Sequence, residues 1–139
     1  MDPLVNAFFA KFEQANATSD VTTIATLYAD TFLFAGPKGS QAVKKEDFLK
    51  VIPKMKAHFA SLGLSGTRLQ SVESSAIDSR YMLAKVAWKL TLQQAASTTE
   101  TLDAFATYVL ERKDGDLLSI IVQIDHQDLA ALIKSRSGQ

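Results

Sequence analysis

The stretch "SDVTTIATLYADTFLFAGPKG", residues 19–39, changes character twice, from helical spacing to an apolar run and then to a turn. Asp20 is a good N-cap, and Val21, Ile24 and Leu27 recur on one side of the helix that would follow it. "TFLF" is a short apolar run typical of a strand, and "GPKG" combines two glycines with a proline. The stretch therefore predicts a helix, a brief strand and a tight turn in direct succession.

Helices are predicted on both sides of this stretch. Residues 2–18 predict an opening helix, because Asp2 can cap it and Pro3 fits its first turn. Residues 44–63 hold a second run of helical periodicity, which Gly63 ends. Pro53 lies inside that run and is expected to kink or split the helix.

Strands are predicted for the second half of the chain, where the apolar period changes from about 3.6 to 2. The predicted strands are residues 66–78, 80–92, 101–112 and 117–125. Residues 93–100 are a polar connection, "KDGD" at 113–116 is a hairpin turn, and residues 126–135 predict a short closing helix. Helices followed by a meander of long antiparallel strands predict one α+β domain over residues 1–139.

Composition excludes several classes of protein. Lys+Arg and Asp+Glu are both 15, so the chain lacks the basic excess typical of a nucleic-acid binder. With no cysteine and only two histidines on separate predicted elements, neither a metal site nor a disulfide is expected, and nothing indicates a cofactor. "MDPLVNAFF" lacks the features of a signal peptide, and no run approaches the roughly 20 apolar residues of a membrane span. A soluble cytoplasmic protein without a nucleic-acid or membrane partner is expected.

The order of elements resembles the nuclear transport factor 2-like superfamily, also called cystatin-like or SnoaL-like. Residues 19–39 are similar to the opening of that superfamily, and "DGDLLSIIVQID", residues 114–125, is similar to its final strand. The resemblance implies a cone, in which a curved antiparallel sheet wraps around three N-terminal helices and leaves a pocket open at one end. The same cone serves unrelated enzymes, binding proteins and assembly domains, so function has to be argued from residues.

Ketosteroid isomerases of this superfamily carry a catalytic carboxylate immediately before the proline of the turn. Gly36 stands at that position here and has no side chain that could act as a general base. The isomerase tyrosine falls at Phe12, which cannot donate a hydrogen bond, and the partner acid falls at Tyr108, which can. The resemblance therefore implies that this chain does not isomerise ketosteroids.

Asp125 and His126 stand at the end of the last predicted strand, where SnoaL-like cyclases and epoxide hydrolases carry an acid. The hydrolases also need an Arg-x-Asp pair, and residues 85–87 read Lys-Val-Ala instead. Neighbouring strand residues point to opposite faces. If the even, more apolar face lines the cone, His126 lies at its mouth and Asp125 points away. Structural roles for both, such as a capping aspartate, stay open. The candidate catalytic residues are His126, Asp125 and Tyr108.

A mostly apolar pocket that binds a small hydrophobic ligand is the first functional hypothesis. Its predicted lining residues are Phe12, Tyr28, Phe34, Trp88, Tyr108 and His126. The alternative is a lyase, isomerase or hydrolase acting on a hydrophobic metabolite, and whether the chain is an enzyme is left open. A cavity of roughly 300 Å³ or more with convergent polar groups would favour ligand binding. A cone filled by aromatic side chains would favour a third hypothesis, a non-catalytic assembly domain.

A homodimer through the outer face of the sheet is also predicted. Strand alternation places Leu83, Phe105, Val109, Leu117 and Ile121 on the face away from the helices, where only Lys85, Lys89, Ser119 and Gln123 interrupt the apolar patch. The rival outcome is that the closing helix at 126–135 folds back over this patch. Soluble monomers seldom expose an apolar patch larger than a few hundred Å². A two-fold contact would cover the same patch on both copies.

Overall fold

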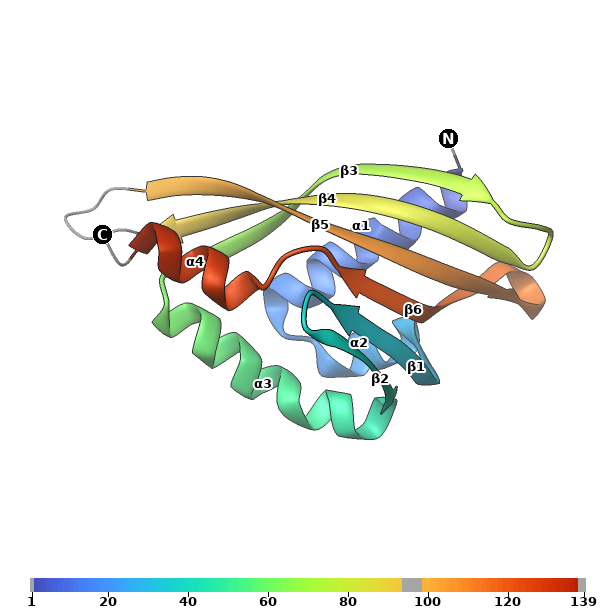
Figure 1. Ribbon diagram of the computed structural model, residues 1–139. Helices are drawn as coiled ribbons and strands as arrows, with labels where there is room; N and C mark the ends of the chain where they lie inside the picture. The colour runs from blue at the N-terminus through green and yellow to red at the C-terminus, as the bar shows by residue number, and fades with distance from the viewer. Residues whose placement is uncertain (1, 94–98, 138–139) are drawn as a thin grey trace.

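The computed structural model describes residues 2–93 and 99–137 and has a six-stranded curved sheet with helices on its inner side (Figure 1). Its α-helices are α1 (Pro3–Thr18), α2 (Val21–Leu27), α3 (Lys45–Ser61) and α4 (Leu129–Ser137). Its strands are β1 (Tyr28–Gly36), β2 (Gly39–Lys44), β3 (Leu64–Ala76), β4 (Tyr81–Gln93), β5 (Thr99–Lys113) and β6 (Leu117–Asp125). The predicted α+β class is confirmed.

The strands are ordered β2-β1-β6-β5-β4-β3, and every pairing is antiparallel except that between β1 and β6. β2 was not predicted, because its segment "GSQAVK" carries no apolar alternation and is largely exposed. It forms a hairpin with β1, in which Gly36 pairs with Gly39. Gly39 has a φ of 135°, a backbone conformation that favours glycine. The predicted polar connection at 93–100 lies mostly outside the described residues.

The helix ends follow from capping. The Asp2 carboxylate accepts the Leu4 N–H at 2.9 Å, and the Asp20 carboxylate accepts the Thr23 N–H at 3.1 Å. α3 runs from Lys45 to Ser61 through Pro53, so the expectation that this proline splits the helix is wrong. A proline inside a helix removes one hydrogen bond, and here the remaining bonds and the packing of the helix keep it continuous.

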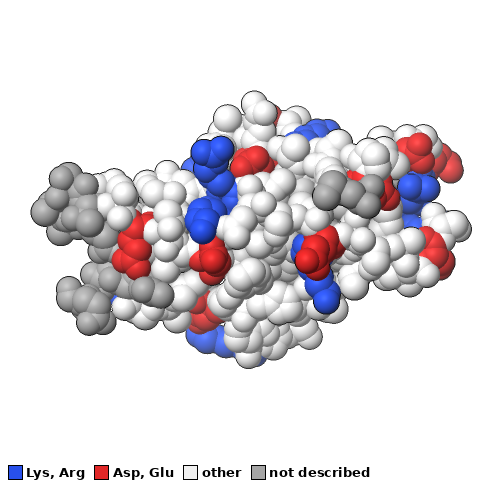
Figure 2. All heavy atoms as spheres, turned by 90° about the horizontal axis from the view of Figure 1, so that it is seen from above, with Lys and Arg blue, Asp and Glu red and all other residues white. Residues whose placement is uncertain are grey.

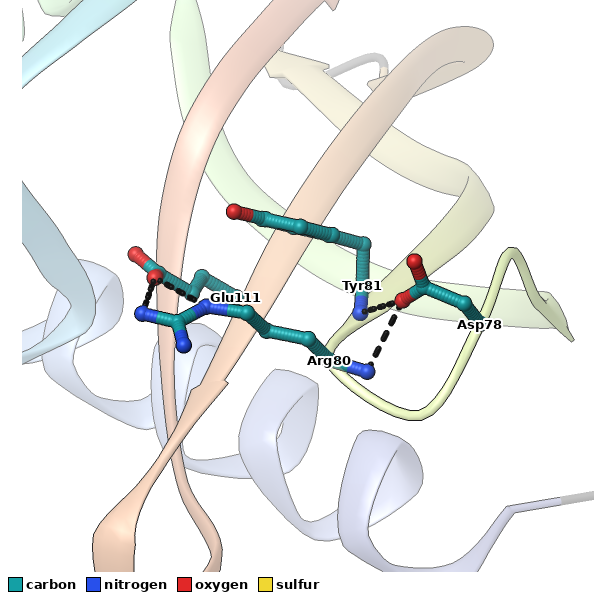
Figure 3. A network of polar contacts seen from close by, with 4 residues as sticks. All are labelled: Asp78, Arg80, Tyr81 and Glu111. Carbon is teal, nitrogen blue, oxygen red and sulfur yellow. Dashed lines mark hydrogen bonds and ion pairs between the residues drawn. The ribbon is translucent and has the colours of Figure 1, made fainter.

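The turn between β3 and β4 is tied to β5 by a polar network (Figure 3). Asp78 Oδ1 accepts the backbone N–H groups of Arg80 at 2.8 Å and of Tyr81 at 2.9 Å. These two donors lower the pKa of the Asp78 carboxyl. The Arg80 guanidinium donates to Glu111 Oε2 through Nε at 2.9 Å and Nη2 at 2.7 Å. The network holds the register of β4 against β5 at this end of the sheet.

The core lies between α1 and the inner face of the sheet. Val5 and Phe9 of α1 are fully buried, as are Leu90 and Leu110 on β4 and β5 within a few per cent. Alternation along β4 turns Met82, Ala84, Val86, Trp88, Leu90 and Leu92 toward this core, as predicted. None of the helices in residues 2–93 and 99–137 combines the length and apolar character that crossing a bilayer requires.

β3 is an edge strand that is only partly available for further pairing. Its ladder with β4 is interrupted by register shifts between Leu64 and Gly66 and between Leu69 and Ser71. The Leu69 N–H donates to Glu13 Oε2 of α1 at 2.6 Å. The helix therefore contributes a side-chain acceptor to the backbone of this strand.

Candidate functional site

Aromatic rings from four elements meet inside the cone. The Phe12 ring of α1 lies 5.5 Å from that of Trp88 and 6.0 Å from that of Tyr108, centroid to centroid. It also lies 6.1 Å from the ring of Tyr28, at the start of β1. Trp88 and Tyr108 are 7% and 2% exposed. These four predicted lining residues are together, and a role in ligand binding stays a prediction.

A chain of polar groups runs along one side of this aromatic cluster. The Tyr28 hydroxyl donates to Gln123 Oε1 at 2.6 Å, and Gln123 Nε2 donates to Asp125 Oδ1 at 3.0 Å. Trp88 Nε1 donates to the Tyr108 hydroxyl at 3.3 Å. In the described part of the chain, no acceptor lies within hydrogen-bond distance of the proton of the Tyr108 hydroxyl. This proton is a free buried donor.

A bulge in β6 decides which of its residues face the cone. Leu110 pairs with Ile120 but Val109 pairs with Val122, so Ile121 is an extra residue that shifts the alternation. Before the bulge, the even-numbered residues of β6 face inward. After the bulge, Gln123 and Asp125 face inward, and they pair with Tyr108 and Ala106 of β5. The sequence left open which face of the last strand lines the cone, and at this end of β6 it is the face of Gln123 and Asp125.

His126 lies on the outer face of the sheet. It is exposed, and its Nε2 lies 2.7 Å from Thr107 Oγ1, a side chain on that outer face. His126 is thus a neighbour of Asp125 in sequence but does not share its side of the sheet. Phe34, the remaining predicted lining residue, pairs with Gln123 and packs against the core.

Burial controls the protonation of the site. Desolvation raises the pKa of the Asp125 carboxyl, while the hydrogen bond from Gln123 and the charge of His126 act in the opposite direction. Desolvation likewise raises the pKa of Tyr108 and of Tyr28, with the Asp125 charge adding to both. Both tyrosines are neutral hydrogen-bond donors at physiological pH, and Asp125 is a carboxyl whose ionised form is disfavoured.

Gly36 adjoins this polar group. A Cβ built on Gly36 would meet the Asp125 carbonyl oxygen at 3.8 Å, an ordinary van der Waals distance. Phe34 and Gly36 share one face of β1, because strand side chains alternate. A side chain at this position would therefore fit and would point toward Asp125, but the chain has none there.

Two hollows of the described residues lie away from this polar group. One of about 380 Å³ is lined by residues that include Asp2 and Ser75, between the start of α1 and β3. The other, of about 480 Å³, is lined by residues that include Lys11 and Thr18, on α1 beside α2. Neither is lined by Phe12, Trp88, Tyr108 or Asp125. Within residues 2–93 and 99–137, no three His, Asp or Glu residues are placed to hold a metal ion.

Replacing Asp125 by asparagine is expected to stabilise the protein at pH 7. The folded-state pKa is raised, so the ionised carboxylate lowers the free energy of unfolding at neutral pH; this cost disappears below the unfolded-state pKa of about 3.9. Asparagine keeps the acceptor for Gln123 and removes the charge. Thermal unfolding should show a higher Tm for Asp125→Asn at pH 7, converging with the wild type near pH 3. Each 1 kcal/mol corresponds to about 3–5 °C for a domain of this size.

Asp114→Asn is the matched control, because Asp114 is exposed in the turn between β5 and β6. It should leave Tm unchanged within about 0.5 kcal/mol at both pH values. A lower Tm for Asp125→Asn at pH 7 would contradict a destabilising charge at Asp125.

Gln123 is the site residue that strand alternation missed. Counted without a bulge, it belongs to the outer face, and an inserted residue cannot be seen in an alternating pattern. One signal was available: Gln123 and Asp125 are two polar residues spaced by two at the end of an apolar strand. Such a pair indicates a shared polar face, whichever side of the sheet it occupies.

Solved structures with the same fold were found at low sequence identity. An NTF2-like protein with a cystatin-like fold from Novosphingobium aromaticivorans superposes with a TM-score of 0.71 at 8% identity, covering 93% of this chain and 85% of that one. A ketosteroid isomerase-like protein from Erwinia carotovora atroseptica gives 0.64 at 13% identity, covering 90% and 94%. A putative calcium/calmodulin dependent protein kinase II association domain from Xanthomonas campestris gives 0.64 at 18% identity, covering 88% and 84%. Identities this low show the fold alone.

Comparison with curated proteins found no match. A family model described as NTF2-like protein (DUF6841) matches residues 2–128, which is nearly the whole chain. Its extent agrees with the cone of helices and curved sheet. The chain belongs to the family of NTF2-like proteins (DUF6841).

Proposed function

We propose that this domain binds a small hydrophobic molecule that carries a hydrogen-bond acceptor, at the end of the cone where Asp125 lies. The observation that carries the proposal is that Tyr108, Gln123 and Asp125 together form a polar group inside the cone, beside aromatic rings. Binding sites for small molecules combine an apolar lining with a few placed polar groups in this way.

The energetic cost of this polar group supports the proposal. A buried carboxyl whose ionised form is disfavoured lowers the stability of the fold at neutral pH, and an apolar residue of similar size would avoid the cost. An association domain that used only its outer face would gain nothing from it. Ionisable groups perturbed by burial cluster at functional sites.

The chemistry of the ligand follows from the protonation states. Tyr108 keeps its proton at neutral pH and has a free donor, so the complementary group is an uncharged acceptor such as a carbonyl or ether oxygen. The rings of Phe12 and Trp88 would face the apolar part of the ligand. An enzyme using this site would have Asp125 and Tyr108 as its proton-transfer groups; His126, on the outer face, would not take part. The cytoplasmic location remains a prediction from the sequence.

Trp88 is the only tryptophan, so its fluorescence reports directly on the site. A panel of apolar ketones and hydrocarbons of matched size is the probe set. A ketone is expected to quench Trp88 saturably, and Tyr108→Phe should weaken its binding about 3–10-fold, the loss of one hydrogen bond. The same variant should leave any hydrocarbon binding unchanged.

Tyr81→Phe is the matched control, since Tyr81 lies at the end of β4 in the network of Figure 3 and away from the cone. It should bind the ketone like the wild type. Absence of saturable quenching by every ketone up to millimolar concentration would contradict the proposal.

Self-association is a second candidate function, which the outer face of the sheet supports. Across the sheet, Leu83 pairs with Val109, Val109 with Val122, and Val122 with Leu33, so one apolar row crosses four strands. Phe105 is 47% exposed on the same face. Figure 2 shows one side of the molecule, on which acidic and basic side chains gather at several places with uncharged surface between them. A second copy of this chain is the proposed partner.

The composition of this apolar face differs from the sequence prediction. Beyond the bulge, Val122 and Ile124 are on the outer face, and Gln123, expected there, is inside. Ser119, also expected to interrupt the patch, is only 7% exposed. Both changes leave the face more apolar than predicted.

A further inference from the structure

Helix α4 contributes a fully buried side chain to the interior of the cone. Ile133 has no exposed surface and belongs to the same core cluster as Trp88 and Tyr108, with Leu129 and Leu132 packed against that cluster. In Figure 1, α4 extends from the end of β6 into the space between the sheet and α3. It follows Asp125 by only three residues. α4 therefore lies at the end of the cone where β6 ends at Asp125.

α4 makes polar contacts with the turn between β1 and β2 and with β5. Its start is held by an ion pair of 3.1 Å between Asp128 and Lys38, whose side chain is 87% exposed, and by the Phe105 N–H, which donates to Gln127 Oε1 at 2.9 Å. Exposed ion pairs contribute little to the free energy of unfolding. α4 spans nine residues, and a helix this short does not persist alone in water, so its folding depends on its apolar contacts with the core.

We propose that α4 is a displaceable plug: Ile133 occupies space that a ligand uses, and the two compete for the interior. This inference rests on the proposed ligand binding. It explains why neither of the two hollows described above is lined by Tyr108, Gln123 or Asp125, because the structure has the plug in place. By linkage, a ligand that binds only when α4 has left must itself increase the undocked fraction of α4.

The absence of cysteine makes a direct test possible, since one introduced thiol is the only one in the chain. Ile133→Cys places it at the buried position and Ala131→Cys at an exposed position of the same helix. Both variants are treated with a small thiol reagent, with and without Nile red, a neutral apolar dye that bears a carbonyl. Without dye, the Ile133→Cys thiol should react about 100-fold or more slowly than the Ala131→Cys thiol, because it reacts only when α4 opens.

Saturating Nile red should accelerate the Ile133→Cys reaction about 10-fold and leave the Ala131→Cys rate unchanged. Dye that binds but slows or does not change the Ile133→Cys reaction would overturn the plug, the slowed rate indicating a lid that closes over ligand. Equal thiol rates without dye would show that α4 does not cover the interior and would also overturn it.

Binding is measured in parallel by dye fluorescence, and the cooperativity of thermal unfolding verifies that each variant is folded. The Ile133→Cys thiol could also be protected in a protein that binds neither the dye nor the ketones. That result would refute the proposed ligand binding, and with it the competition between ligand and α4, while showing that α4 is docked. Should Ile133→Cys fail to fold, Leu132→Cys, one residue away and partly buried, takes its place with the same expected acceleration.

Discussion

Phe105→Glu is expected to convert a dimer of about 30 kDa, twice the chain mass of 15.2 kDa, into a monomer. Phe105 is nearly half exposed on the outer face, four residues along β5 from Val109 of the apolar row that runs from Leu83 to Leu33. A glutamate there would bring a charge into an apolar contact with no partner to offset its desolvation, twice in a two-fold dimer. Exposed aromatic residues near the centre of an interface contribute most of its binding energy.

Light scattering at micromolar concentration measures the mass, and Ile77→Glu is the control. Ile77 is 57% exposed, but it lies in the turn between β3 and β4, outside the apolar row. The Ile77→Glu variant should remain dimeric. A wild-type mass near 15 kDa that does not change with concentration would refute the dimer, and a Phe105→Glu protein that stays near 30 kDa would move the contact to another face.

No isomerisation of a β,γ-unsaturated ketosteroid above the uncatalysed rate is expected from the wild-type protein. Gly36 provides no general base, a loss that alone typically reduces the rate about 10²–10⁴-fold. Phe12 provides no hydroxyl beside Tyr108. The standard spectrophotometric assay of the conjugated product measures this directly. Turnover that Asp125→Asn abolishes would instead identify an enzyme.

The double variant Gly36→Asp with Phe12→Tyr tests whether isomerase activity is lacking because catalytic groups are absent or because the cone has no room for a steroid. Both side chains are expected to be accommodated: a Cβ built on Gly36 has ordinary contacts, and the Phe12 ring already lies beside the rings of Tyr28 and Tyr108. The variant is nevertheless expected to stay inactive, because the rings of Phe12, Trp88 and Tyr108 pack against one another where the steroid would have to bind. A rise of about 10²-fold or more would show that the interior opens to admit one.

Sequence patterns predicted the parts of the molecule where one apolar face is continuous. Along β4 every second residue from Met82 to Leu92 is buried, and this alternation placed Trp88 inside the cone. The patterns failed where a local irregularity intervened. The bulge at Ile121 exchanged the faces of the last residues of β6, so that Asp125 turned inward and His126 outward. β2 was missed because an edge strand with both faces exposed needs no apolar pattern.

The contact between Glu13 and Leu69 limits how the molecule could polymerise through the edge of its sheet. An exposed edge strand invites a neighbouring molecule to add another strand, and repetition of that step leads to fibres. On β3 one backbone N–H is already occupied by the Glu13 carboxylate, and two register shifts break the straight ladder that an incoming strand would have to match. Polymerisation along this edge is thereby discouraged. Association through the outer face of the sheet would then stop at a dimer, since a two-fold contact buries the same surface on both copies.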